Sequence, residues 1–327
     1  MKSNLKLLTL LILSTLVVGC LWIFDKNAEN LANDKEAQFA IADTSEVVKI
    51  FIADNYGEVV LERNKGDEYF TVNGEFTARK SSTDLLLKTF SRATIKAPVD
   101  EKKRENVIRT LGASSRKVEI YTGEGELEKT WYVGSSTPSH TGTYMVLETP
   151  EHGMASEPFV VHMEGFTGFL TTRFFTDLDE WKYTGIFNYR NRSLAEVEVI
   201  NHNETYNSYS IRTDSTGVIK LFNIKGDEIG IDNRIHIQDQ FNRFRKVHFE
   251  SFNSRLTVDQ EKDLIANGEA SYTITCMDKE GASTTVILFD KDEEHMYGLT
   301  EDGQVVLVQT FVFNPLTIGL LDLVQIN

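Results

Sequence analysis

The stretch EVVKIFIADNYGEVVLER, residues 46–63, decides the fold class of this chain. β-branched and aromatic residues dominate 46–53 and again 58–63, a composition typical of strands. Asn55, Tyr56 and Gly57 lie between the two runs and favour a tight turn. We therefore expect a β-hairpin near the start of the folded part of the chain.

Two helical patterns and four more strand-like runs follow this hairpin. Ser81 or Ser82 is expected to cap the first helix and Asp100 the second, which Gly112 is expected to end. The apolar faces of these helices carry Leu86, Leu87 and Phe90, and then Val107, Ile108 and Leu111. The strand-like runs are 117–121, 127–134, 143–147 and 159–163. The pattern predicts an α+β domain over residues 39–163.

The second half of the chain repeats the order of elements found in the first. Strand-like runs are followed by a helix at 235–245, an extended piece, and a helix that the capping box Thr257-x-x-Gln260 opens and Gly268 ends. Five residue pairs keep a similar separation: Phe90 with Phe244, Gly112 with Gly268, Ile120 with Ile274, Val133 with Leu288, and Tyr144 with Tyr297. We therefore expect two similar mixed-sheet α+β domains, produced by an internal duplication, with the second over residues 194–327.

The stretch between the two halves, residues 164–193, is unusually aromatic. It contains Phe166, Phe169, Phe174, Phe175, Trp181, Tyr183, Phe187 and Tyr189. An exposed linker would be more polar, so we expect a packed connector between the domains, and its aromatic side chains near Trp181 could line an apolar pocket.

The chain begins with an apolar segment that predicts a membrane anchor. Residues 5–24 run from Leu5 to Phe24 and carry one charge, Lys6. Twenty helical residues span about 30 Å, the thickness of a bilayer core. Lys2 and Lys6 would keep the N-terminus in the cytoplasm, so the remainder of the chain would lie outside the cytoplasm and be anchored in the inner membrane. Residues 25–38 are polar and are expected to form a spacer.

A second interpretation of the same segment is a lipoprotein signal. Residues 17–20, Val-Val-Gly-Cys, fit a bacterial lipobox, in which Cys20 would receive lipid and become the first mature residue. The apolar run continues through Leu21–Phe24, whereas lipoproteins usually turn polar soon after the cysteine. Residues 1–24 are therefore a signal-anchor helix or a lipoprotein signal, and we favour the retained helix.

Composition excludes several functional classes. The 34 Lys and Arg against 49 Asp and Glu give a net charge of −15, which disfavours nucleic acid as a partner. Only two cysteines are present, so a folded part that contains Cys276 alone can form neither an internal disulfide nor a site of paired cysteines. We expect Cys276 to be a small buried apolar residue.

Several of these segments resemble a bacterial family called domain of unknown function 4340, in its Bacteroidota form. They are FAIADTSEVVKIFIAD (39–54), VVLER (59–63), KTWYVGSS (129–136), GTYMVL (142–147) and PFVVHMEGFTGFLTTRF (158–174). The resemblance implies a membrane-anchored envelope protein, often encoded near ABC-type transporter and gliding-associated genes. It brings no catalytic or binding residue. Cys20 departs from the family, whose members commonly have plain signal anchors.

No phosphate-binding loop, dinucleotide fingerprint, metalloprotease helix or nucleophile elbow is present in the sequence. Ser139 stands beside His140 in a polar loop, where a hairpin connection is the favoured interpretation over a nucleophile and its base. Asp290, Asp292, Glu293 and Glu294 could offer oxygens to calcium, but they lack the spacing of a calcium loop and favour a solvated turn. We therefore expect no catalytic residue, metal or cofactor.

Two functions follow from these observations. The first is a non-catalytic interaction module, tethered to the membrane through residues 5–24, that binds another envelope protein such as an ABC-type permease or its auxiliary subunit. The second is an envelope hydrolase or ligand-binding protein with a site near Trp181. The missing catalytic motifs favour the first.

Overall fold

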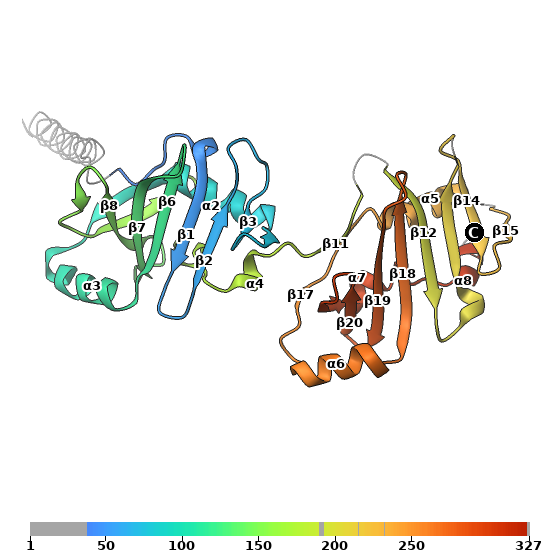
Figure 1. Ribbon diagram of the computed structural model, residues 1–327. Coiled ribbons are helices and arrows are strands. Elements are labelled where there is room, and N and C mark those ends of the chain that lie inside the picture. The colour runs from blue at the N-terminus through green and yellow to red at the C-terminus, as the bar shows by residue number, and fades with distance from the viewer. Residues whose placement is uncertain (1–37, 190–192, 215, 232, 326–327) are drawn as a thin grey trace, which may run out of the picture. The chain divides into compact units, whose positions relative to one another are not determined.

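The computed structural model describes residues 38–189, 193–214, 216–231 and 233–325 of the 327-residue chain (Figure 1). The chain divides into two compact units, the first ending at Tyr183 and the second beginning at Thr184. No helix within the described ranges is long and apolar enough to span a bilayer. The expected anchor, Cys20 and all of the spacer except Gln38 lie outside these ranges.

The first unit is built on one large sheet whose path runs β4-β3-β2-β1-β6-β7-β8-β10-β5, with β9 paired to β8. Its strands are β1 (Val47–Ala53), β2 (Glu58–Glu62), β3 (Thr71–Val72), β4 (Phe76–Thr77), β5 (Ala93–Pro98), β6 (Arg116–Thr122), β7 (Glu126–Ser136), β8 (Thr143–Thr149), β9 (Gly153–Met154) and β10 (Phe159–Met163). Its helical elements are η2 (Thr44–Glu46), α2 (Lys80–Arg92), α3 (Glu101–Ser114), η3 (Thr171–Arg173) and α4 (Leu178–Trp181).

The second unit carries a nine-stranded sheet and a separate two-stranded pair, β11-β16. The strands are β11 (Gly185–Asn188), β12 (Leu194–Asn201), β13 (Tyr209–Thr213), β14 (Ile219–Asn223), β15 (Glu228–Ile229), β16 (Lys246–His248), β17 (Ser251–Phe252), β18 (Ala270–Asp278), β19 (Ser283–Asp290), β20 (His295–Thr300) and β21 (Val305–Gln309). The helical elements are η4 (Thr205–Asn207), α5 (Arg234–Arg243), α6 (Val258–Asn267), α7 (Thr310–Phe313) and α8 (Leu320–Gln325).

The two sheets share one strand order. The second runs β15-β14-β13-β12-β18-β19-β20-β21-β17, which repeats the nine-strand path of the first. Helices α2 and α5 follow β4 and β15, the first strands of the two paths, and α3 and α6 precede β6 and β18, the fifth strands of the two paths. The α+β class and the similarity of the two domains, both expected from the sequence, are thus seen in the structure.

Strand register shows how closely the two sheets correspond. In β1 and in β12 the pairing shifts at the same place, after Val47 and after Leu194. Ile50 pairs with Ile120, and its counterpart Val197 pairs with Cys276. Ile120 therefore corresponds to Cys276 and not to Ile274, the partner expected from sequence spacing. For Val133 with Leu288 and Tyr144 with Tyr297, the expected pairing agrees with the register.

All described strand pairs in both sheets are antiparallel, where mixed sheets were expected. The reason lies in the connection between β1 and β6. A single crossover helix returns the chain parallel to the strand it left. Here the chain enters α2 from β4, which runs opposite to β1 because β1 to β4 form an antiparallel meander. The crossovers through α2, β5 and α3 keep that direction, so β6 lies antiparallel to β1.

The aromatic stretch 164–193 is shared between two separate cores. Leu170, Phe174 and Trp181 are fully buried in the core of the first unit, and Phe187 is fully buried in that of the second. The unit boundary at 183/184 lies inside this stretch. The buried aromatic residues of the stretch are therefore core residues of whichever unit they belong to, whereas Phe166 is exposed.

Some of the expected helix caps are confirmed by the structure, and others are wrong. Asp100 accepts from the amide of Lys102, and Thr257 and Gln260 form the expected capping box, with Gly268 as the C-cap. Gly112 does not end α3, which continues to Ser114. Neither Ser81 nor Ser82 caps α2, which begins at Lys80.

The start of α2 is instead set by a distant segment. The amide of Arg79 donates to the carbonyl of Trp181 at 2.6 Å, and the amide of Tyr183 donates to that of Thr77 at 2.8 Å. These bonds align the chain before α2 with residues 181–183, so no serine side chain is needed there.

Candidate functional site

A groove in the second unit is the strongest candidate site. It lies between β16 with the residues that follow it and the segment from Gln309 to Leu316, and its volume is about 590 Å³. Val247, Phe249 and Leu316 line it and are at most 7% exposed. The ring of Phe311, on α7, also lines the groove and is 78% exposed. The groove therefore has an apolar lining and one large solvent-facing ring.

A difference between the two sheets opens this groove. In the first unit β5 pairs with β10 along its whole length, up to Met163. In the second unit, the pairing of β17 with β21 ends at Leu307, and the preceding residues 246–248 pair with β11 instead. Val308 and Gln309 at the end of β21 therefore have no β17 partner, and the gap beside them is the groove.

The register also identifies what the first unit has in place of Phe311. Val161 pairs with Thr143 as Val308 pairs with Met296, so Phe311 corresponds to Glu164. Glu164 is exposed, and its amide donates to the carbonyl of Arg92 at 3.1 Å, which holds this part of the chain against the end of α2. An exposed polar residue in one unit is thus an exposed aromatic residue in the other.

Basic side chains lie beside the apolar lining. Arg243 and Lys246 are exposed, and neither side chain has an ion pair or hydrogen bond within the described part of the chain. The carboxylate of Glu250, the one acidic lining residue, lies 3.1 Å from Nε2 of His295. The sequence analysis missed this site, although the basic run 243–246, Arg-Phe-Arg-Lys, stands out in an acidic chain.

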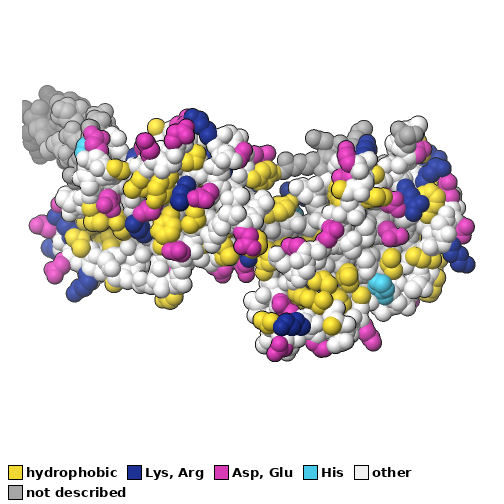
Figure 2. Space-filling view, in the orientation of Figure 1, with side chains coloured by type: hydrophobic (Ala, Val, Ile, Leu, Met, Phe, Trp, Pro, Cys, Tyr) yellow, Lys and Arg dark blue, Asp and Glu magenta, His cyan; other side chains and the backbone are white. Residues whose placement is uncertain are grey.

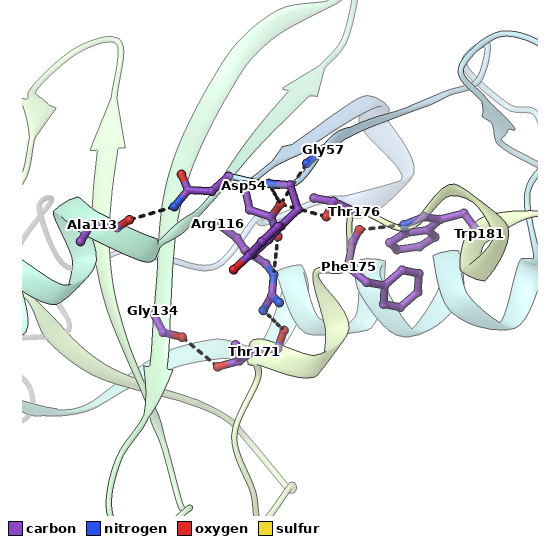
Figure 3. A network of polar contacts seen from close by, with 11 residues as sticks. Asp54, Gly57, Ala113, Arg116, Gly134, Thr171, Phe175, Thr176 and Trp181 are labelled. Carbon is purple, nitrogen blue, oxygen red and sulfur yellow. Dashed lines mark hydrogen bonds and ion pairs between the residues drawn. The ribbon is translucent and has the colours of Figure 1, made fainter.

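A network of polar contacts in the first unit joins the β1–β2 turn to the aromatic stretch (Figure 3). Asp54 accepts from the amides of Tyr56 and Gly57 at 2.9 and 3.2 Å and from the Thr176 hydroxyl at 3.0 Å, and lies 3.4 Å from Nε of Arg116. Arg116 donates in turn to the carbonyl of Thr171 at 3.1 Å. The network holds residues 171–176 against the sheet.

The electrostatics of Asp54 follow from these contacts. Burial acts to raise the pKa of this carboxyl, but the hydrogen bonds from Tyr56, Thr176 and Gly57, together with the charge of Arg116, outweigh burial and leave the pKa below its ordinary value. Asp54 is therefore ionised at neutral pH. Because all its partners belong to the first unit, we interpret the network as structural.

Ser139 and His140, adjacent in a polar loop, have different side-chain partners. Nδ1 of His140 lies 3.2 Å from the hydroxyl of Ser136, and the hydroxyl of Ser139 lies 2.9 Å from that of Thr141. His140 is exposed, packs against the ring of Phe169 and has a φ of 54°. Among the described residues no third side chain is recorded orienting its imidazole, so the geometry is that of a polar hairpin connection.

The acidic turn at 290–294 is organised by its own backbone. Asp292 accepts from the amides of Glu294 and His295 and contacts the ammonium group of Lys291, and these contacts hold its pKa well below the ordinary value, with the Lys291 bond the largest cause. No group of three or more His, Cys, Asp or Glu within the described ranges could hold a metal ion.

Trp181 does not line an open pocket in the first unit. Its side chain is fully buried, its indole nitrogen donates to the carbonyl of Phe175 at 3.0 Å, and its ring lies 4.2 Å from that of Phe175. Cys276 is also fully buried, as expected, and burial raises the pKa of its thiol well above the ordinary value.

The outer face of the first sheet is a second exposed surface with apolar character. Figure 2 shows hydrophobic side chains over β1, β6 and β7, with charged side chains among them. Those charged groups already have partners: Lys49 lies 2.9 Å from Glu62, and the hydroxyls of Tyr121 and Tyr132 donate to Glu119 and Glu148 at 2.7 Å. This face leaves fewer charges open to a partner than the groove does.

No protein-family model matches the chain, and no curated protein matches it. The site is therefore interpreted from its own geometry, which defines a two-unit antiparallel α+β protein with an apolar groove and a basic rim in its second unit.

Proposed function

We propose that this protein is a non-catalytic, membrane-tethered envelope protein that binds another protein through the groove of its second unit. The observation that carries the proposal is Phe311, a large ring 78% exposed beside an apolar lining, at a position where the first unit has Glu164. Large exposed aromatic residues in concave apolar surroundings are typical of protein-binding sites. Duplication followed by divergence of one copy accounts for both the shared strand order and the groove beside β21.

Residues 5–24 supply the tether in this proposal, as a retained helix or through lipid on Cys20, and place the two units outside the cytoplasm. The resemblance to the domain of unknown function 4340 family makes an ABC-type permease, its auxiliary subunit or a gliding-associated component the first partner to test.

Photocrosslinking in intact cells tests the proposal. A photoreactive phenylalanine analogue replaces Phe311, and the matched control replaces Tyr56, which is 96% exposed in the first unit. We expect one discrete adduct from position 311 that is absent from position 56, and its mass and peptide content identify the partner. Equal labelling from the two positions, or none from either, would contradict the proposal.

A further inference from the structure

We infer that the groove binds an extended, acidic polypeptide segment that carries a large apolar side chain. The inference rests on the proposed function and specifies the chemistry of the partner. It follows from three features found together: the unpaired cations Arg243 and Lys246, the exposed ring of Phe311, and the end of β21 that lacks a β17 partner.

The positive charges of Arg243 and Lys246 at the groove indicate the charge of the partner. In a chain of net charge −15, basic side chains have acidic neighbours in excess, and several are paired. Such pairs include Lys49 with Glu62, Lys80 with Asp84, Arg212 with Glu196 and Lys220 with Glu228. Arg243 and Lys246 both line the groove, and within the described ranges neither has such a partner. A local positive patch of this kind attracts and orients an acidic ligand.

The extended shape follows from the strand edge. Gln309 lines the groove where β21 has lost its β17 neighbour, and β16 forms the opposite wall. An extended segment laid beside a free strand edge can form backbone hydrogen bonds, while its alternate side chains enter pockets. A volume of about 590 Å³ accommodates only a few side chains, which limits the contact to a short segment.

A lipid surface fits these features less well. Val247, Phe249 and Leu316 are recessed, so the apolar surface is concave, whereas a flat bilayer reaches protruding residues. Vesicle binding is therefore an opposing outcome of the test.

The test measures binding of fluorescein-labelled peptides to the full-length protein in detergent by fluorescence anisotropy. One peptide alternates Glu with Leu and Phe, and a second has Lys in place of each Glu. We expect the acidic peptide to bind at least tenfold more tightly than the basic one, and added salt to weaken it. The double substitution Arg243→Glu with Lys246→Glu should weaken the acidic peptide about tenfold, which corresponds to about 1.4 kcal/mol.

Phe311→Ser should weaken both peptides, because it removes the apolar contact. The controls are Lys225→Glu, the same charge reversal at an exposed turn of the second unit, and Ile235→Ser at an exposed position on α5. Circular dichroism melts confirm that each variant is folded.

The outcomes separate this inference from the proposed function. If position 311 crosslinks a partner but the two peptides bind equally, or the charge reversal has no effect, the inference about charge and shape is wrong and the proposed function stands. Absence of a crosslink from position 311 overturns the proposed function. Binding to phosphatidylglycerol vesicles that requires Phe311, without peptide binding, would assign the groove to lipid and overturn the inference.

Discussion

Replacing Asp54 with alanine should destabilise the first unit by about 2 kcal/mol. The carboxylate accepts three hydrogen bonds and pairs with Arg116, and its side chain is only 11% exposed. A hydrogen bond to a charged group contributes about 1.5–3 kcal/mol when its partner is left buried. Here water can reach the amides of Tyr56 and Gly57 in the variant, and Arg116 is 31% exposed, so the net loss is close to the value of a single such bond, about 2 kcal/mol.

Tryptophan fluorescence isolates this effect. The three tryptophans of the chain are Trp22, Trp131 and Trp181, so none lies in the second unit. In a Trp22→Phe background, emission comes only from Trp131 and Trp181, both fully buried in the first unit. The free energy of unfolding of a domain of this size falls by about 2 kcal/mol per M urea, so a loss of about 2 kcal/mol lowers the urea midpoint by about 1 M.

The matched control is Asp84→Ala, which removes an exposed helical pair with Lys80. Such pairs contribute about 0.3–0.5 kcal/mol, so its midpoint should move by less than about 0.3 M. If Asp54→Ala moves the midpoint no further than this control, the network does not hold residues 171–176 in place, and our interpretation of Figure 3 is wrong.

The pH dependence of the same variant has a defined sign. The folded pKa of Asp54 lies below its ordinary value of 3.8. A carboxyl with a lowered pKa contributes its stability above the unfolded pKa and loses it as the pH falls through the folded pKa. The difference between wild type and Asp54→Ala should therefore be constant from pH 7 to about 5 and should shrink below pH 4. A difference that grows on acidification would refute this assignment.

Four other substitutions and one labelling experiment test further parts of the structure. Trp181→Ala should cost the first unit about 3–5 kcal/mol by leaving a cavity in its core, measured by urea unfolding with Trp131 as the reporter, and Trp181→Phe should cost less. Gly112→Ala should stabilise α3 by about 0.5–1 kcal/mol, because Gly112 lies inside the helix with nothing within 4 Å of an added Cβ, and a loss of stability would contradict its helical placement. Gly268→Ala should destabilise the second unit by about 1–3 kcal/mol, because the new Cβ would lie 2.4 Å from the carbonyl oxygen of Leu264. The melting temperature of the second unit should fall, and an unchanged melting temperature would show that the end of α6 can relax. In a Cys20→Ser background, Cys276 should resist thiol reagents in the native protein and react fully in denaturant, and rapid native labelling would contradict its burial.

Local signals in the sequence predicted the parts of the fold that neighbouring residues determine. The hairpin over 46–63, the Asp100 cap and the Thr257–Gln260 capping box depend on residues close in the chain. The similarity of the two halves was visible because burial repeats along whole strands. Ile120 was nonetheless assigned the wrong counterpart, because spacing alone cannot locate a register shift.

Features set by distant contacts could not be predicted in this way. The start of α2 depends on Trp181 and Tyr183, which lie far along the chain. The groove depends on where β17 stops pairing with β21, and nothing in the local pattern of residues 246–252 marks that point. Phe311 lies near this open strand edge, and its ring is exposed although Phe313 and Leu316 beside it in the sequence are buried.

The shared strand order has a consequence for how the chain reaches its native state. The first strand of each large sheet lies inside that sheet, so its second partner is synthesised much later: β6 for β1, and β18 for β12. With two sheets of one topology in a single polypeptide, β1 could capture β18 and produce an exchanged, trapped species. The central pairs differ in bulk, since Ile120 and Trp131 in one unit correspond to Cys276 and Val286 in the other. An exchanged sheet would therefore contain cavities or clashes in its core. The divergence of the two halves thus disfavours the exchanged species relative to the native one.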